Sequence, residues 1–182
     1  NRGTIGGSVA HADPAADLPV VLTALNASFV AQSPTGKRII SVDDFFTDFY
    51  TTALNANEIL TEIRVPIPAA GTGAAYAKLP HPASGYVVVS VAAMITRQAS
   101  GTCTASRIAI GGLGSAPIRA IATELELQGK PLTTQMIAAA AAKAAEETDP
   151  MEDSYASAEY KRHVATVYAR KAIETAVERA KN

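Results

Sequence analysis

A run of small and polar residues at 4–8, TIGGS, carries groups that can bind an anion. The adjacent glycines Gly6 and Gly7 lack a Cβ, so backbone N–H groups can converge on one ligand. The hydroxyls of Thr4 and Ser8 add further donors. The run predicts either a loop that binds a phosphate-bearing ligand or an ordinary Gly-Gly turn at the surface.

The residues around this run suggest what such a ligand would contain. Residues 1–17 are rich in Gly, Ala, Asp and Pro, and we expect them to form a loop that leads into an apolar helix at 18–25. Asp17 is the expected N-cap, with Pro19 in the first turn. The helix dipole favours an anion there by about 0.3–1 kcal/mol. Carboxylates such as Asp13 and Asp17 repel phosphate but accept hydrogen bonds from sugar hydroxyls. A nucleotide with a diphosphate and a polyol satisfies both requirements.

Other cofactor and metal motifs are incomplete. Gly36-Lys37 has Ala31 where a P-loop needs glycine, and Arg38 where it needs Ser or Thr. The glycine cluster at 111–117 ends in proline where a dinucleotide-binding turn needs glycine. HExxH, CxxC and GxSxG are absent from the sequence, and only three histidines are present. The sequence therefore argues against hydrolase and metalloenzyme functions.

Composition limits the class of protein. The chain has 182 residues, of which 48% are hydrophobic and 18% charged, as expected of a globular protein with a core. A net charge of −1 gives no basic surface for nucleic acid. We find neither an 18-residue apolar run nor a secretory leader, and Cys103 has no partner for an internal disulfide. We expect a cytoplasmic protein without a membrane span, and Cys103 buried in a strand.

The elements that must position the TIGGS run follow from apolar periodicity and from turn residues. We expect a β-hairpin around the turn at 33–36, and a short helix and loop at 43–50 whose aromatic rings enter a core. The strand at 58–65 should place Ile59, Ile63 and Val65 on one face. The expected strands are 27–32, 37–42, 58–65, 74–79, 86–97 and 102–110, and the expected helices are 18–25, 117–127, 133–147 and 158–181.

The chain divides at the Pro- and Gly-rich stretch 66–73, which is the best linker candidate. Residues 69–182 are expected to form a self-contained α+β unit, with an antiparallel sheet of about three strands followed by a three-helix bundle. Pro117 suits the first position of the first helix of that bundle, and Gly129 suits the position after its end. The whole chain is therefore expected to be α+β.

Three segments in the same order resemble a known family: NRGTIGGSVAHADPAADLP at 1–19, EILTEIRVP at 58–66 and AAYAKLPHPASGY at 74–86. They are similar to the FAD-binding, or medium, subunit of molybdenum hydroxylases, in the carbon monoxide dehydrogenase and xanthine dehydrogenase flavoprotein family. The resemblance covers the whole chain. It implies that 1–68 is the second α/β lobe of a two-lobed FAD-binding domain, that the first lobe is missing, and that 69–182 is the C-terminal domain.

The resemblance also implies roles for single residues. Asp17 would bind a ribityl or ribose hydroxyl, Leu60 would contact the flavin or adenine, and Lys78 would be a cation beside the cofactor. From the residues alone, Leu60 can equally be a core residue and Lys78 a solvated lysine. The diphosphate and ribityl region would lie against Thr4, Ile5, Gly6, Gly7 and Ser8.

Two further residues have weaker expectations. His11 is expected only to line the loop, and Tyr86 either approaches the flavin or begins a strand with its ring in the core, which we favour. The stretch after Lys78, PHPASGYVVV, lacks the arginines and acids found there in xanthine dehydrogenase. We therefore expect no charged contacts with the cofactor from it.

The function implied by the resemblance is electron transfer. FAD would take electrons from iron–sulfur clusters on a small partner subunit and pass them to an external acceptor, while a molybdopterin cofactor sits on a large subunit. No catalytic residue and no metal ligand is expected on this chain. The alternatives are a stand-alone FAD-dependent oxidase and a non-catalytic module that docks partner subunits.

Overall fold

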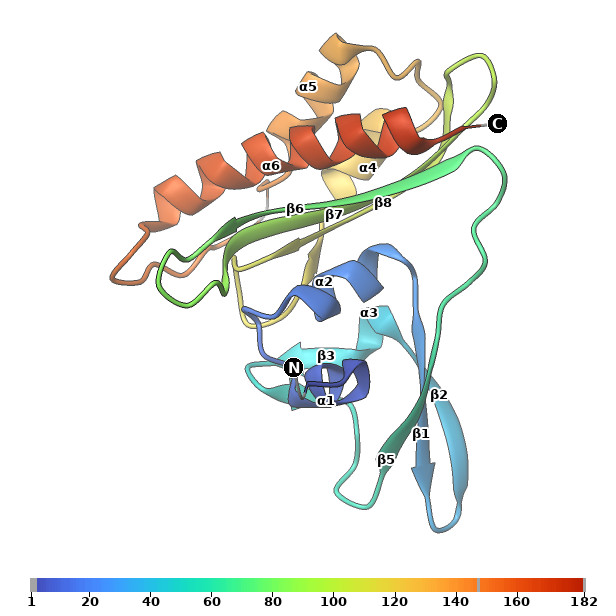
Figure 1. Cartoon of the computed structure of the whole chain (residues 1–182), viewed down its shortest axis with the longest axis vertical. Helices are drawn as coiled ribbons and strands as arrows, with labels where there is room; N and C mark the ends of the chain where they lie inside the picture. Colours follow the sequence, from blue (N-terminus) through green and yellow to red (C-terminus); the bar gives the residue numbers. More distant parts are fainter. Residues whose placement is uncertain (1–2, 147, 182) are drawn as a thin grey trace.

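The largest sheet of the molecule lies between helices on both of its faces (Figure 1). The helices α4 (Ile121–Leu127), α5 (Thr134–Ala142) and α6 (Ala158–Arg179) lie on one face, and α2 (Asp17–Ala24) packs against the other. The sheet has four antiparallel strands in the order β6 (Thr72–Pro80), β7 (Val87–Arg97), β8 (Cys103–Gly111) and β9 (Ile118–Arg119).

The structure is a computed structural model that describes residues 3–146 and 148–181. Its N-terminal part holds two small sheets and two further helices, α1 (Ile5–His11) and α3 (Val42–Phe45). One sheet has the order β2 (Gly36–Ser41), β1 (Ser28–Ser33) and β5 (Ile59–Arg64), and the other pairs β3 (Phe46–Asp48) with β4 (Thr51–Thr52).

Strand β7 is the centre of the main core. Its residues are buried almost without interruption, because helices cover both faces of the sheet. On the face of α6, Val91 and Ile95 join the cluster that contains Ile173. On the other face, the small side chains of Ala92 and Ala109 meet α2. α2 therefore belongs to the core of the main sheet and also borders the N-terminal part.

Helix α6 lies unusually close to β6 at Gly73. A Cβ at this position would overlap the backbone oxygen of Ala176 and the backbone nitrogen of Ala180. Only glycine allows this approach of strand and helix.

Most of the predicted elements are confirmed. The hairpin β1–β2, the helix α2, the strands β5 to β8 and the long helix α6 lie within a few residues of their expected positions. Cys103 is buried in β8, and Gly129 follows α4 with a positive φ of 71°. Helix α5 is shorter than the predicted 133–147, whose last residue, Glu147, lies outside the described residues.

The prediction of a loop over residues 1–17 was wrong. Residues 5–11 form α1, in which Thr4 is the N-cap and Val9 is fully buried against the core of the N-terminal part. Burial of Val9 and the Thr4 cap outweigh the low helix propensity of the two glycines. His11 is the last residue of this helix and its ring lies beside Tyr50, so it does not line a loop. Asn1 and Arg2 lie outside the described residues.

Three other predictions need correction. Pro117 does not begin a helix, because residues 118–119 pair with β8 and α4 starts only at Ile121. Ile59 is exposed, whereas Leu60 and Ile63 pack on the core, because a bulge at Val30/Ala31 breaks the alternation of β5. Aromatic rings are only partly buried: Phe45 is in the core, but Phe49, Tyr50 and Tyr86 are exposed.

Candidate functional site

The TIGGS run is the start of α1, not a Gly-Gly turn. Thr4 Oγ1 accepts a hydrogen bond of 3.0 Å from the N–H of Gly7. The first N–H groups of a helix have no partner within it. Those of Ile5 and Gly6 find no hydrogen-bond partner within residues 3–146 and 148–181. The predicted convergence of backbone donors is therefore present, but it comes from a helix start.

A groove of about 390 Å³ opens beside this helix start. Ile5 and Gly6 line it from α1, and residues 60–63 and Val65 line it from β5. Open space surrounds the position that a Cβ of Gly6 would occupy. Leu60 packs on the core, as one of its two expectations requires, and it also borders the groove, while its contact with the flavin or adenine stays a prediction. The groove offers backbone donors at one side and apolar contacts at the other.

Asp17 lies at the start of α2, where it meets two side chains of β6. Ala16 is the N-cap, so Asp17 is the first helical residue and not the cap itself. Its carboxylate accepts a hydrogen bond from the Tyr76 hydroxyl and pairs with Lys78 Nζ at 2.9 and 3.0 Å. Burial and the hydrogen bond to Asp17 raise the pKa of Tyr76, so its hydroxyl remains a donor. A carboxylate held from one side keeps its other lone pairs for a ligand hydroxyl.

Lys78 is neither a solvated lysine nor an unpaired cation. Its ammonium group has three donors, and besides both Asp17 oxygens it reaches the backbone oxygen of Gly85 at 3.1 Å. Asp17 and Lys78 are thus brought together by the fold, across 61 positions in the chain. Lys78 holds Asp17 and the turn at 81–86 in place.

Tyr76 also contacts Asp17, and the sequence did not predict this contact. Side chains two apart on a strand point to the same face, so Tyr76 and Lys78 both reach Asp17 from β6. The spacing was visible in the segment AAYAKLP. What was not visible is that α2 packs on this sheet and brings Asp17 to it.

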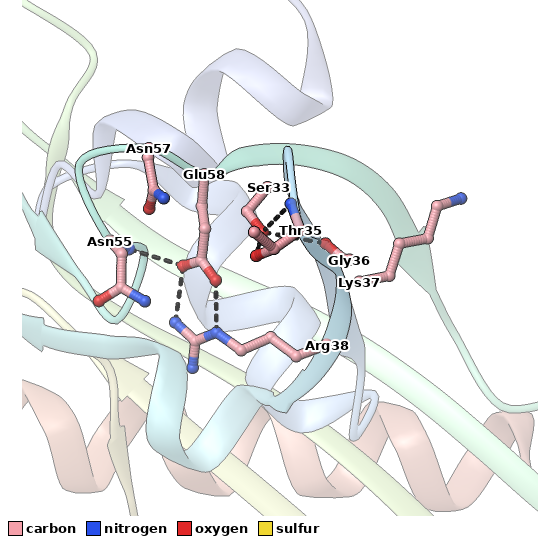
Figure 2. A pocket seen from close by; sticks show the side chains of 8 residues that line it. All are labelled: Ser33, Thr35, Gly36, Lys37, Arg38, Asn55, Asn57 and Glu58. Atoms are coloured by element: carbon pink, nitrogen blue, oxygen red, sulfur yellow. Dashed lines mark hydrogen bonds and ion pairs between the residues drawn. The ribbon is translucent and has the colours of Figure 1, made fainter.

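A second hollow, of about 370 Å³, lies beside the β1–β2 hairpin (Figure 2). Arg38 and Glu58 both line it, and the Arg38 guanidinium donates two hydrogen bonds to the Glu58 carboxylate, of 2.6 and 2.7 Å. The N–H of Asn55 also bonds Glu58, and these bonds, that from Arg38 foremost, lower the pKa of Glu58 to about 2. Arg38 and Glu58 are already paired with each other, and their ion pair joins β2 to the segment at 55–58.

No group of three or more His, Cys, Asp or Glu side chains gathers within residues 3–146 and 148–181 in a way that could hold a metal ion. No helix in the same part of the chain is long and apolar enough to cross a bilayer.

The chain matches two family models. Residues 1–68 match the FAD binding domain in molybdopterin dehydrogenase, and residues 74–176 match the CO dehydrogenase flavoprotein C-terminal domain. Among similar proteins, the 6-hydroxypseudooxynicotine dehydrogenase complex subunit alpha of Paenarthrobacter nicotinovorans is 36% identical over 100% of this chain and 61% of its own length. The carbon monoxide dehydrogenase medium chain of Afipia carboxidovorans is 35% identical over 99% and 62%.

Solved structures of the same kind share the fold. Carbon monoxide dehydrogenase from Hydrogenophaga pseudoflava, which lacks the Mo-pyranopterin moiety of the molybdenum cofactor, superposes with a TM-score of 0.93 at 39% identity. That match covers 99% of this chain and 62% of the solved one. Quinoline 2-oxidoreductase from Pseudomonas putida 86 gives a TM-score of 0.91 at 33% identity, over 100% and 63%.

The chain therefore spans less than two thirds of the length of these relatives. The two family models, the similar proteins and the solved structures all indicate the same family. It is also the family that the three sequence segments resemble. This chain belongs to the family of FAD-binding medium subunits of molybdenum hydroxylases.

Proposed function

We propose that the groove between α1 and β5, together with Asp17, forms one wall of an FAD site. The observation that carries this proposal is that Ile5 and Gly6, whose N–H groups have no partner among the described residues, line an open groove at the start of α1. A helix start of this kind suits a diphosphate. In this proposal Thr4 to Ser8 bind the diphosphate and ribityl region, and Leu60 supplies an apolar contact.

The donor set fits the polar parts of FAD. Asp17 is paired with Lys78, so the two charges offset each other and the site favours neutral hydroxyls over phosphate. Asp17 would therefore accept from a ribityl or ribose hydroxyl, oriented by Tyr76 and Lys78. In this proposal Lys78 is the cation beside the cofactor, and it also holds Asp17 in place.

The protein's task is to bind and orient the cofactor, since a bound flavin carries out the electron transfer itself. The described residues offer polar groups that hold and place a nucleotide, and the proposal names no catalytic residue among them. We propose that the complete subunit relays electrons from iron–sulfur clusters on a small subunit to an external acceptor. The molybdopterin cofactor would lie on a large subunit of the same complex.

The organisation of the complete protein is part of the proposal. Residues 1–68 would be the second lobe of the FAD-binding domain and 69–182 the C-terminal domain, which agrees with the limits of the two family models. A first lobe, outside this chain, would supply the other wall of the FAD site. We propose a cytoplasmic location for the complex.

Purification of the full-length subunit from its native host tests the proposal. We expect flavin absorbance in the visible range, one FAD per subunit after release and quantification, and iron and molybdenum in the same fractions. Flavin without either metal would instead favour a stand-alone oxidase. A colourless full-length protein that stays colourless after incubation with FAD would refute the flavin assignment.

A further inference from the structure

The turn at 81–86, which follows β6, is held from the far side by the segment between α5 and α6. Tyr155 of that segment packs its ring against the ring of His81, with centroids 4.7 Å apart and planes tilted by 59°. Aromatic pairs in this geometry contribute beyond their buried area. The contact joins two segments 74 positions apart, counted from their residue numbers 81 and 155.

The segment that carries Tyr155 is itself firmly anchored. Lys161 is buried on α6, and its Nζ lies 2.7 Å from the backbone oxygen of Met151 and 2.8 Å from the Asp153 carboxylate. Asp153 in turn accepts hydrogen bonds from the N–H groups of Tyr155 and Ala156, at 2.8 and 2.9 Å. The bond from Lys161 is the main reason why the pKa of Asp153 is lowered to about 2. Tyr155 therefore projects from a rigid support.

His81 shapes the turn from within. Its Nδ1 accepts from the N–H groups of Ala83 and Ser84, at 3.3 and 3.4 Å, and its backbone oxygen accepts from Gly85 N–H at 2.8 Å. The position of the His81 ring thus decides where the turn's backbone lies. Gly85 has a φ of 73°, which a residue with a Cβ rarely adopts, so the turn has little freedom to relax elsewhere.

The other end of the turn meets the residues proposed to bind FAD. The backbone oxygen of Gly85 accepts one of the hydrogen bonds of Lys78, whose other bonds hold Asp17. Directly after the turn, Val87 N–H bonds the backbone oxygen of Ala15 at 3.1 Å, two residues before Asp17. A continuous set of contacts thus runs from Tyr155 through the turn to Asp17.

We infer that Tyr155 is a positioning residue for the FAD site, which it supports by packing on His81 and so fixing the turn that holds Lys78 and Asp17. This inference rests on the proposed FAD site. Tyr155 does not touch the cofactor in this account. Its role is to keep the Asp17 carboxylate oriented before the cofactor binds.

Three variants of the full-length subunit, within its complex, test this role. Tyr155→Ala removes the ring, Tyr155→Phe keeps the ring and removes the hydroxyl, and Tyr160→Ala is the matched control. Tyr155 and Tyr160 are each 46% exposed, but among the described residues the ring of Tyr160 pairs with no other aromatic ring. Two quantities are measured: hydrogen exchange of the amides at 83–87, and the Kd of FAD for the deflavinated complex.

We expect Tyr155→Ala to speed exchange at 83–87 and to weaken FAD binding, each by about two- to tenfold, the range that an aromatic pair accounts for. Tyr155→Phe and Tyr160→Ala should match the wild type in both. The inference is overturned if Tyr155→Ala matches Tyr160→Ala in either measurement, or if Tyr155→Phe fails to restore both. Wild-type protein that binds no FAD would instead refute the proposed site itself, and the inference with it.

Discussion

At the scale of single residues, Gly6 leaves the first turn of α1 uncovered, because nothing described lies within 4 Å of the position its Cβ would take. A methyl group there would project toward the groove beside Leu60 without meeting the protein. Gly7 differs, since its Cβ would lie 3.0 Å from Thr4 Oγ1, the atom that caps the helix. The two glycines can therefore be tested separately, one for ligand access and the other for the cap.

Gly6→Ala should leave the folded state as stable as the wild type or up to about 1 kcal/mol more stable, because alanine is the better helix former. The same change should weaken FAD binding, since the methyl group narrows the approach to the backbone donors. Thermal unfolding and FAD titration of the full-length subunit separate the two effects. Gly7→Ala, in contrast, should gain no net stability, because the disturbed cap costs about 1 kcal/mol and offsets the better helix propensity of alanine. Unchanged FAD affinity in Gly6→Ala would contradict a cofactor at this helix start.

Glu58 predicts a specific dependence of stability on pH. Its pKa is lowered from 4.5 to about 2 in the folded protein, chiefly by the hydrogen bond from Arg38. The stabilisation is therefore complete above pH 4.5 and is lost as the pH falls toward 2. Glu58→Gln should lower the Tm at neutral pH, and its difference from the wild type should shrink across this range. Glu152→Gln, at an exposed carboxylate without an ion pair in the described part of the chain, is the control and should show no such convergence.

At the scale of elements, the contact of β6 with α6 depends on one missing side chain. Gly73→Ala places a methyl group on backbone atoms of α6, which cannot move aside as a side chain can. We expect a loss of about 3 kcal/mol or more in the free energy of unfolding, measured by denaturant titration. Gly114→Ala is the control, because its Cβ would meet only Ile118 Cδ1, at an ordinary 3.5 Å. Equal stability of the two variants would show that the helix and strand can separate freely.

The elements also show how far sequence patterns reach. Strands β7 and β8 were predictable as apolar runs bounded by turn residues, and helix α6 because its apolar residues repeat with the helical period. Helix α1 was not, because its stability comes from burying Val9 among residues distant in the chain. The predicted face of β5 was also wrong, since β5 has one extra residue, Thr61, where it pairs with Val30 and Ala31 of β1. Local pattern identifies an element, whereas neighbours decide its limits and its faces.

For the candidate site, the sequence predicted single residues but not the contacts between them. Thr4 to Ser8 and Asp17 were selected from their chemistry, and Leu60 and Lys78 from the family resemblance. The fold places Ile5, Gly6 and Leu60 at the groove, and Asp17 and Lys78 together at the start of α2. The pairing of Asp17 with Lys78 and its hydrogen bond from Tyr76 depend on α2 packing against β7 and β8 of the same sheet. No spacing within one segment contains that information.

At the scale of the whole molecule, an ion network joins the N-terminal part to the main sheet. Asp43 of α3 pairs with Arg107 of β8 and lies 3.6 Å from Arg119 of β9. Arg107 also donates to the backbone oxygen of Thr23 in α2, at 2.6 Å, and is only 11% exposed at its side chain. The network joins α3 and the end of α2 to strands β8 and β9 of the main sheet.

Asp43→Asn should lower the free energy of unfolding by about 1–2 kcal/mol, because it leaves the nearly buried Arg107 without its charged partner, although Asp43 itself is partly exposed. The difference in the free energy of unfolding between the wild type and Asp43→Asn should be smaller at high salt, because salt partly screens the ion pair. Asp44→Asn is the neighbouring control, since Asp44 has no ion pair within the described residues. If both variants unfold alike, the network does not hold the two parts together.

Titration of FAD into the deflavinated full-length subunit, wild type against Asp17→Asn, tests the central claim most directly. We predict saturable binding of one FAD by the wild type, and a Kd about ten- to hundredfold higher for Asp17→Asn, the cost of losing a charged hydrogen-bond acceptor. The Tm of the two proteins should differ by only a few degrees, because the Asp17–Lys78 pair is partly exposed. Equal affinity of the two proteins, or no saturable binding by the wild type, would contradict the account.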